Sequence, residues 1–97
     1  MNSPAPGDVT VRHNAAASRF EAGEGAYLAV AEYTLADGHM VFTHTFVPPE
    51  LRGFGIAEKL VRAGLELARA ESRRVVPQCS YVATFIQRHP EFQPLLA

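Results

Sequence analysis

Apolar and polar residues alternate along the first half of the chain with the period of two that is typical of β-strands. Three segments follow this pattern, Asp8 to His13, Ser18 to Ala22 and Ala26 to Leu35. The pair Asp37-Gly38 comes next, and both residues tolerate the positive φ angles of a tight hairpin turn. A fourth strand is predicted from Met40 to Val47. Together these segments predict an antiparallel meander with short turns.

Strict alternation divides the fourth segment into two faces. One face is predicted to carry the side chains of Met40, Phe42, His44 and Phe46. We therefore expect His44 to lie on the same side of the sheet as its aromatic neighbours.

A helical period begins after a short loop. From Ile56 to Glu71, apolar residues recur every three or four positions, and charged residues occupy the other side. This pattern predicts an amphipathic helix with its apolar face on the sheet. Gly64 lies within that apolar face, and we interpret it as a place where the helix approaches the sheet closely.

The end of the chain predicts one more strand and one more helix. The strand runs from Arg73 to Cys79 and contains Pro77, which cannot donate a hydrogen bond to a neighbouring strand. The helix runs from Ser80 to Arg88, and Glu91 to Ala97 form a short tail. The predicted order is therefore ββββαβα, an α+β arrangement.

Length and composition indicate one globular domain. The chain has 97 residues, of which 47% are hydrophobic and 20% charged, enough for a single core. Residues 1–7 contain Pro, Gly and Ser and are predicted to be a flexible N-terminal arm. Residues 8–97 are predicted to form the domain.

Charge and cysteine content exclude several classes of function. The net charge is −1 without a basic block, which argues against binding to nucleic acid. Apolar runs are shorter than the ~20 residues of a transmembrane helix, so we expect a cytoplasmic protein with no membrane partner. The single cysteine, Cys79, excludes an internal disulfide framework and CxxC zinc sites. The histidines show no spacing typical of metal ligands, and no metal is expected.

The loop before the first helix reads Arg52-Gly53-Phe54-Gly55-Ile56-Ala57. The first N–H groups of a helix have no partners within it, and the helix dipole favours negative charge there. Gly53 and Gly55 have no Cβ to obstruct a ligand. The strand–loop–helix junction therefore predicts a site for a phosphate-bearing ligand.

The same six residues resemble the acetyl-CoA-binding signature of the GNAT superfamily of N-acetyltransferases, which is Gln or Arg, two variable residues, Gly, one variable residue, then Gly or Ala. The resemblance extends over His44 to Gly53, Val76 to Val82 and Arg88 to Phe92. These segments resemble the very small, single-domain subfamily that has a cysteine after the fifth strand. This resemblance implies a minimal GNAT fold, a mostly antiparallel sheet of about five strands with two helices.

The resemblance also implies how coenzyme A would bind. Its pyrophosphate is expected on the backbone of Arg52, Gly53, Phe54, Gly55, Ile56 and Ala57. Its pantetheine is expected between the fourth and fifth strands, bound by the backbone of Phe46 and Val47. The N–H group of Val47 would polarise the thioester carbonyl. Whether the Arg52 side chain contacts phosphate or is simply solvated is open at this stage.

Three residues are candidates for catalysis. Cys79 is predicted at the N-terminus of the last helix, a position that lowers the pKa of a thiol. Its role is either that of an acetyl acceptor activated by His44 or that of an inert thiol lining the pocket. His44 is either that base or a histidine of the core. Tyr81 resembles the tyrosine that protonates the departing thiolate in many GNAT enzymes.

Two functions remain open from the sequence. The first is an acetyl-CoA-dependent N-acetyltransferase that acts on an amine, in a small molecule or a protein. The alternative is a non-catalytic coenzyme A-binding module with a regulatory or scaffolding role. Larger GNAT enzymes have helices between their first two strands that help to form the acceptor site, and Asn14 to Ser18 leaves no room for them. The acceptor and the oligomeric state stay undefined.

Overall fold

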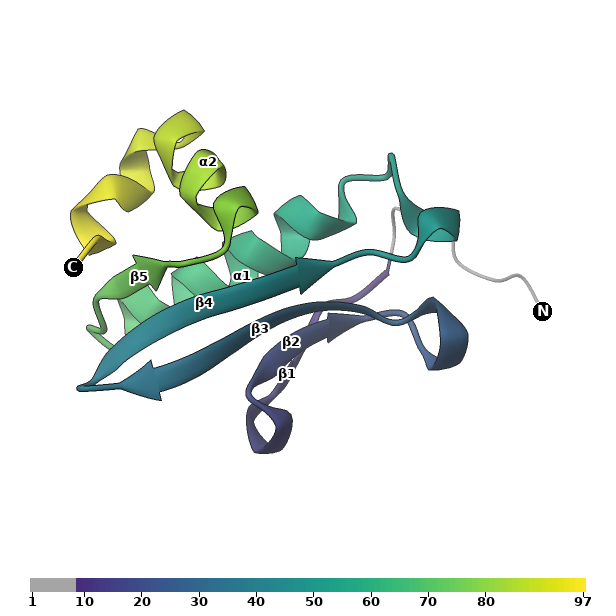
Figure 1. Cartoon of the computed structure of the whole chain (residues 1–97), viewed down its shortest axis with the longest axis horizontal. Coiled ribbons are helices and arrows are strands. Elements are labelled where there is room, and N and C mark those ends of the chain that lie inside the picture. The colour runs from purple at the N-terminus through teal and green to yellow at the C-terminus, as the bar shows by residue number, and fades with distance from the viewer. Residues whose placement is uncertain (1–8) are drawn as a thin grey trace.

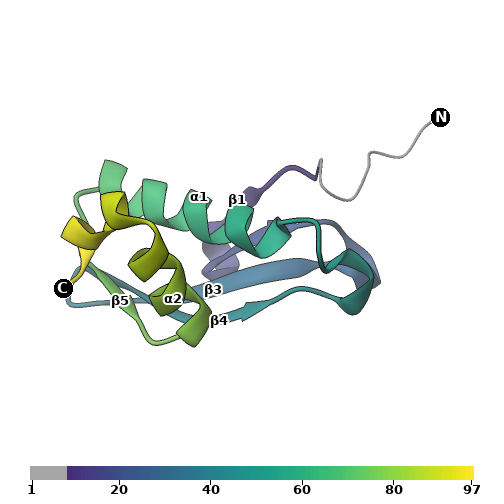
Figure 2. The same cartoon turned by 90° about the horizontal axis from the view of Figure 1, so that it is seen from above.

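A single sheet with the strand order β1-β2-β3-β4-β5 carries both helices on one face (Figures 1 and 2). The computed structural model describes residues 9–97, so the predicted arm of residues 1–7 lies outside the described residues. The elements are β1 (Arg12–Asn14), β2 (Arg19–Ala22), β3 (Ala29–Ala36), β4 (His39–Phe46), α1 (Ile56–Ala70), β5 (Val75–Pro77) and α2 (Ser80–Arg88). No helix within residues 9–97 is long and apolar enough to cross a membrane.

The order ββββαβα and the α+β fold class are confirmed. Strands β1 to β4 are antiparallel neighbours, and β5 joins β4 in parallel. Within residues 9–97 there are also four 3₁₀ turns, namely η2 (Ala15–Ala17), η3 (Gly25–Tyr27), η4 (Pro49–Leu51) and η5 (Pro90–Leu95). The third strand is shorter at its start than predicted, because η3 takes up residues that alternate like a strand in sequence.

A β-bulge interrupts the alternation of β4. Glu32 pairs with His44, but the next residue of β3, Tyr33, pairs with Phe42, so Thr43 has no partner on β3. One extra residue moves each later side chain of the strand to the opposite face of the sheet. Phe42 is 1% exposed on the helix-covered face, whereas Phe46 is 43% exposed on the other. The prediction that His44 and Phe46 share a face with Phe42 was therefore wrong.

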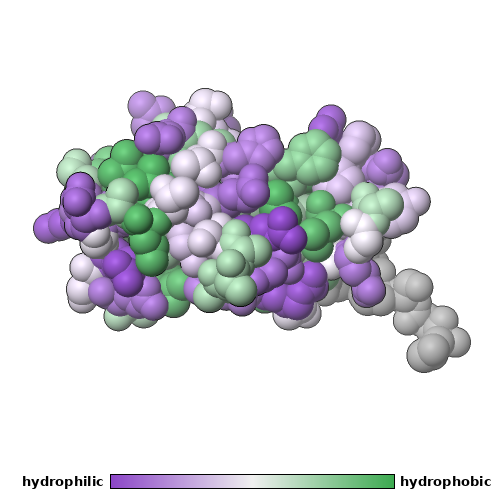
Figure 3. Space-filling view, turned by 60° about the horizontal axis from the view of Figure 1, so that its bottom comes forward, coloured by the Kyte–Doolittle hydropathy of each residue, from purple (hydrophilic) through white to green (hydrophobic). Residues whose placement is uncertain are grey.

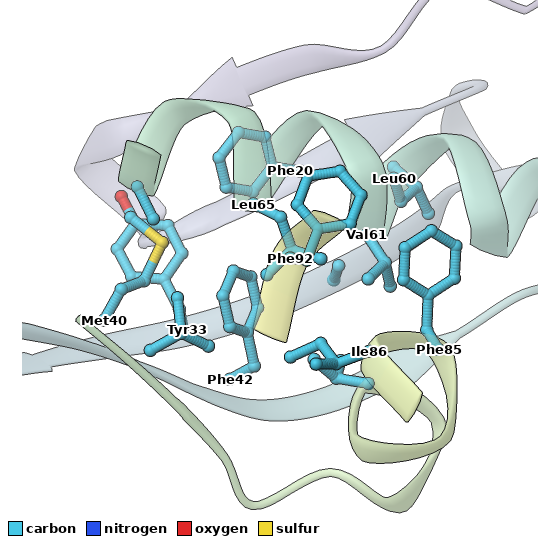
Figure 4. Close-up of a cluster of buried hydrophobic side chains, with 14 of the residues drawn as sticks. Phe20, Tyr33, Met40, Phe42, Leu60, Val61, Leu65, Phe85, Ile86 and Phe92 are labelled. Carbon is cyan, nitrogen blue, oxygen red and sulfur yellow. The ribbon is translucent and has the colours of Figure 1, made fainter. Parts of the chain in front are cut away.

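The face that the helices leave uncovered is turned toward the viewer in Figure 3, and it mixes hydrophobic with hydrophilic residues. His44 is exposed there, opposite Glu32 of β3. The core lies on the other face, between the sheet and the two helices (Figure 4). Its largest fully buried side chains include Phe42, Phe92, Met40, Ile56, Leu60, Leu65 and Ile86.

Gly64 lies where α1 crosses the aromatic part of the core. A Cβ at this position would be 2.7 Å from Cε1 of Phe42 and 3.2 Å from Cε2 of Phe20. Such distances are shorter than van der Waals contact, so the interpretation of Gly64 as a point of close helix–sheet packing is confirmed.

Replacing Gly64 with Ala is expected to destabilise the protein although alanine favours helices. Overpacking a core costs about 1–3 kcal/mol, and the gain in helix propensity returns about 1 kcal/mol. The expected net loss is therefore about 1 kcal/mol in the free energy of unfolding, measured by urea denaturation. The double variant Gly64→Ala/Phe42→Leu serves as control, because a smaller side chain at 42 should make the Gly64→Ala change less costly. A stability gain in the single variant would contradict the packing interpretation.

Candidate active site

Strands β4 and β5 separate after a short parallel ladder. Met40 to Phe42 pair with Val75 to Pro77, and the last backbone bond across is from the N–H of Cys79 to the carbonyl of Phe42, at 2.9 Å. Pro77 has no N–H to donate, so it cannot extend the ladder. Beyond this point β4 presents an open edge beside the N-terminus of α2.

The backbone alternation of β4 determines which groups face this opening. Successive residues of a strand direct their N–H and C=O groups to opposite sides. Tyr33 of β3 donates its N–H toward β2. Val30 lies three residues before Tyr33, so its N–H and C=O groups point the opposite way, toward β4. There it pairs with Phe46, whose main-chain groups point back toward β3. The main-chain groups of Phe46 are thus turned away from the opening, contrary to expectation. Those of Thr45 are turned toward it.

Cys79 lies at this opening, as the N-cap residue of α2. Its thiol is half-buried and donates a hydrogen bond to the hydroxyl of Thr45, with 3.5 Å between Sγ and Oγ1. Burial acts to raise the pKa of Cys79. The deprotonated sulfur would instead accept hydrogen bonds from the Thr45 hydroxyl and from the backbone of Val82, Tyr81 and Thr45, and these outweigh burial, so that the pKa lies below its ordinary value. A thiolate is the nucleophilic form of cysteine, and this environment favours it.

His44 does not share this environment. Neighbouring residues of a strand project to opposite faces, so His44 points away from the side on which Thr45 meets Cys79. The predicted activation of Cys79 by His44 therefore has no geometric support, and a separate role for His44 as a base stays a prediction. Thr45 is the residue that the sequence analysis missed. The alternation pattern placed it on the wrong face, and no signal in the sequence marks the bulge.

The loop between β4 and α1 depends on two glycines for its conformation. Gly53 has φ of 87° and Gly55 has φ of 74°, values that side chains disfavour. Gly55 is the N-cap residue of α1 and offers no side-chain hydrogen bond to the helix. The first N–H groups of α1, those of Ile56 and Ala57 included, consequently have no acceptor within the helix. A Cβ on either glycine would meet nothing within 4 Å, so the space in front of the loop is open.

Arg52 folds back on the loop. Its Nε donates to the carbonyl of Val47 at 2.9 Å, and the side chain is therefore bound to protein rather than simply solvated. This bond connects the end of β4 with the start of the glycine loop, and it restrains the loop on which a ligand would lie.

A pocket of about 230 Å³ connects the loop with both helices. It is lined by Val47, Leu51, Arg52, Gly53, Gly55, Ile56, Ala57, Glu58 and Tyr81. Most of the predicted loop residues are among them, whereas Phe54 is 47% exposed and does not line it. Burial, and then the negative charge of Glu58, raise the pKa of Tyr81. This phenol therefore keeps its proton at neutral pH.

The described residues offer no metal centre. Within residues 9–97, no group of three or more His, Cys, Asp or Glu side chains is placed to hold a metal ion. The chemistry that this arrangement offers is that of a cysteine with a lowered pKa at the β4–β5 opening, and of a protonated phenol and an uncapped helix N-terminus at the loop pocket.

Comparison with known families agrees with this geometry. The model of a family described as GCN5-related N-acetyl-transferase matches residues 19–95. The matched range includes β4, the glycine loop, α1, β5 and the N-terminus of α2. Every part of the candidate site thus lies within the family match.

Replacing Thr45 with Val is expected to raise the pKa of Cys79, because the variant keeps the size of the side chain and removes the hydroxyl that stabilises the thiolate. The measurement is the rate of alkylation by iodoacetamide as a function of pH. The wild-type inflection should lie below that of the same protein unfolded in denaturant, and the Thr45→Val inflection should move to higher pH. Thr43→Val is the matched control, since its hydroxyl binds the carbonyl of Glu32 instead. Equal profiles for wild type and Thr45→Val would contradict this role of Thr45.

Proposed function

The chain belongs to the GCN5-related N-acetyltransferase family, and on this basis we propose that it transfers an acetyl group from acetyl-CoA to an amine by way of Cys79. The observation that carries the proposal is the position of the Cys79 thiol. It lies at the opening between β4 and β5, bound to the Thr45 hydroxyl and with a lowered pKa. These are properties of a nucleophile rather than of a buried structural cysteine.

The residues of the loop pocket fit the anionic part of coenzyme A. The N–H groups at the start of α1 have no side-chain cap, and such groups favour phosphate. The space in front of Gly53 and Gly55 is open. The carboxylate of Glu58 lines the same pocket, but it is already paired with Arg62, at 3.4 Å. When bound, acetyl-CoA supplies an acetyl group activated as a thioester.

In the first half of the proposed reaction, the Cys79 thiolate attacks the acetyl carbonyl. A bond forms between Sγ and the acetyl carbon, the bond from that carbon to the donor sulfur breaks, and the electron pair leaves on the donor sulfur. Tyr81 is the proposed proton donor to that sulfur, since it holds its proton and lines the same pocket. The N–H groups of Thr45 and Val47 are the proposed donors to the carbonyl oxygen.

In the second half, Cys79 is the leaving group. The amine attacks the acetyl carbon, a C–N bond forms, and the Sγ–C bond breaks to restore the thiolate. The proton of the amine returns to the Tyr81 phenolate, directly or through solvent, and this restores the starting state of the site. The lowered pKa of Cys79 helps this step as well, because a stabilised thiolate leaves more readily.

A second function is favoured by one observation. The connection between β1 and β2 consists of the short turn η2 and Ser18, so no helix covers the acceptor side there. A coenzyme A-binding module that transfers nothing would need no acceptor site. If the protein is an enzyme, the alternative mechanism is direct transfer from acetyl-CoA to the amine, without an acetylated cysteine.

Incubation with acetyl-CoA is expected to add one acetyl group to Cys79, detected by intact-mass and peptide mass spectrometry after acid quenching. Cys79→Ala should lose the adduct and lower turnover on an amine panel by at least about 100-fold, the scale of losing a catalytic group. Undiminished turnover in Cys79→Ala would instead establish direct transfer. Tight binding of acetyl-CoA without turnover of any amine would favour the binding module.

Tyr81→Phe removes the proposed proton donor and keeps the ring. We expect the rate of acetyl transfer to Cys79 to fall by about 100-fold, while the Kd for coenzyme A, measured by calorimetry, changes little. A thioester donor with a more acidic thiol should restore much of the rate, because its sulfur needs less protonation. An unchanged rate in Tyr81→Phe would exclude Tyr81 as the proton donor.

A further inference from the structure

A second pocket, of about 130 Å³, adjoins the loop pocket on the outer side of α2. It is lined by Glu58, Tyr81, Thr84, Phe85, Arg88 and His89. Glu58 and Tyr81 line both pockets, so the two form one continuous surface between the start of α1 and the exposed side of α2.

Arg88 differs from the other arginines of the chain. Each of the others donates to a carboxylate or a backbone carbonyl of the protein, as the bonds of Arg12, Arg19, Arg52, Arg62, Arg69, Arg73 and Arg74 show. Among residues 9–97, no carboxylate or carbonyl accepts a hydrogen bond from Arg88, whose side chain is exposed at the pocket. Its place in the last turn of α2 complements the helix dipole, but that role does not require a pocket beside it.

The exposed side of α2 leads from the reaction site to Arg88. Tyr81, Thr84 and Arg88 follow each other at helical spacing, so they share one side of the helix. At a rise of 1.5 Å per residue, Arg88 lies about 10 Å along the helix axis from Tyr81. A ligand that extends from Tyr81 to the glycine loop, with its phosphates at the loop, would thus have the Thr84 hydroxyl and the Arg88 guanidinium within reach.

The other wall of this pocket is already occupied by internal contacts. The ring of His89 stacks on Phe85 at 4.0 Å, and its Nδ1 lies 2.8 Å from the carbonyl of Phe85. Glu58 is paired with Arg62, and its carboxylate is 4.0 Å from Nε2 of His89. An anion in the pocket would therefore bind at Thr84 and Arg88, away from the carboxylate of Glu58.

We propose that Arg88, assisted by the hydroxyl of Thr84, binds the 3′-phosphate of coenzyme A. A guanidinium matches the geometry of a phosphate with two parallel hydrogen bonds. The contact makes the protein select coenzyme A over 3′-dephospho-coenzyme A. This inference rests on the proposed function, in that the donor is a coenzyme A thioester.

The test is the Kd of coenzyme A and of 3′-dephospho-coenzyme A, measured by calorimetry at fixed ionic strength for wild type, Arg88→Gln and Arg74→Gln. Wild type should bind the dephospho form about 5- to 10-fold more weakly, the scale of a charge-assisted contact in a partly exposed site. Arg88→Gln should bind both forms with the affinity that wild type has for the dephospho form. Arg74→Gln makes the same charge change at an arginine whose guanidinium is bound to the carbonyl of Pro94, and it should keep the wild-type preference.

The outcomes separate the two proposals. If Arg88→Gln keeps the full preference for coenzyme A, or if wild type binds both forms equally, the 3′-phosphate assignment is overturned while the donor site stands. If wild type binds neither form, the proposed donor site is wrong and the Arg88 assignment falls with it. An equal loss of preference in Arg74→Gln would show a general effect of net charge and would also overturn the assignment.

Discussion

The bulge at Thr43 is the constraint on which the candidate site depends. It adds one residue to β4 between Phe42 and His44, and the faces of the strand exchange at that point. Before the bulge, Phe42 fills the core against Gly64 of α1. After the bulge, Thr45 takes the side on which Cys79 lies. Without the extra residue, His44 would take that side and Thr45 would face solvent, so the same sequence would build a different site.

The separation of β4 from β5 is the second feature that forms the candidate site. Pro77 ends the ladder, and α2 begins within three residues of it. The start of α2 is thus brought beside the free edge of β4, where N–H groups from both elements converge on one sulfur. Hydrogen bonds from the backbone and from a neutral hydroxyl are what lower the pKa of Cys79 against the effect of its burial. Under the proposed mechanism, this arrangement would favour the nucleophilic form of Cys79 without a neighbouring histidine.

The sequence predicted the parts of this structure that depend on local pattern. The period of the α1 segment, the Asp37-Gly38 turn, the close packing at Gly64 and the glycine loop all follow from residues near one another in the chain. The bulge does not, because it is a property of how β4 pairs with β3, and an alternating pattern reads the same with or without an inserted residue. The bond from Arg52 to the carbonyl of Val47 and the pairing of Thr45 with Cys79 likewise depend on contacts that no spacing encodes. The start of β3 was misplaced because Tyr27 alternates like a strand residue but closes the turn η3.

The contrast between the loop pocket at the start of α1 and the short, uncovered β1–β2 connection fits the proposed two-step transfer. In direct transfer, donor and acceptor must be bound together, so each needs its own site. With the acetyl group held on Cys79, the donor is able to leave before the amine arrives, and the amine reaches the same carbon through the vacated pocket or across the open edge of β4. A single pocket then serves both substrates in turn. The short η2 turn, which leaves no room for an acceptor-binding helix, is under this mechanism a consequence of using a cysteine and not a defect of the site.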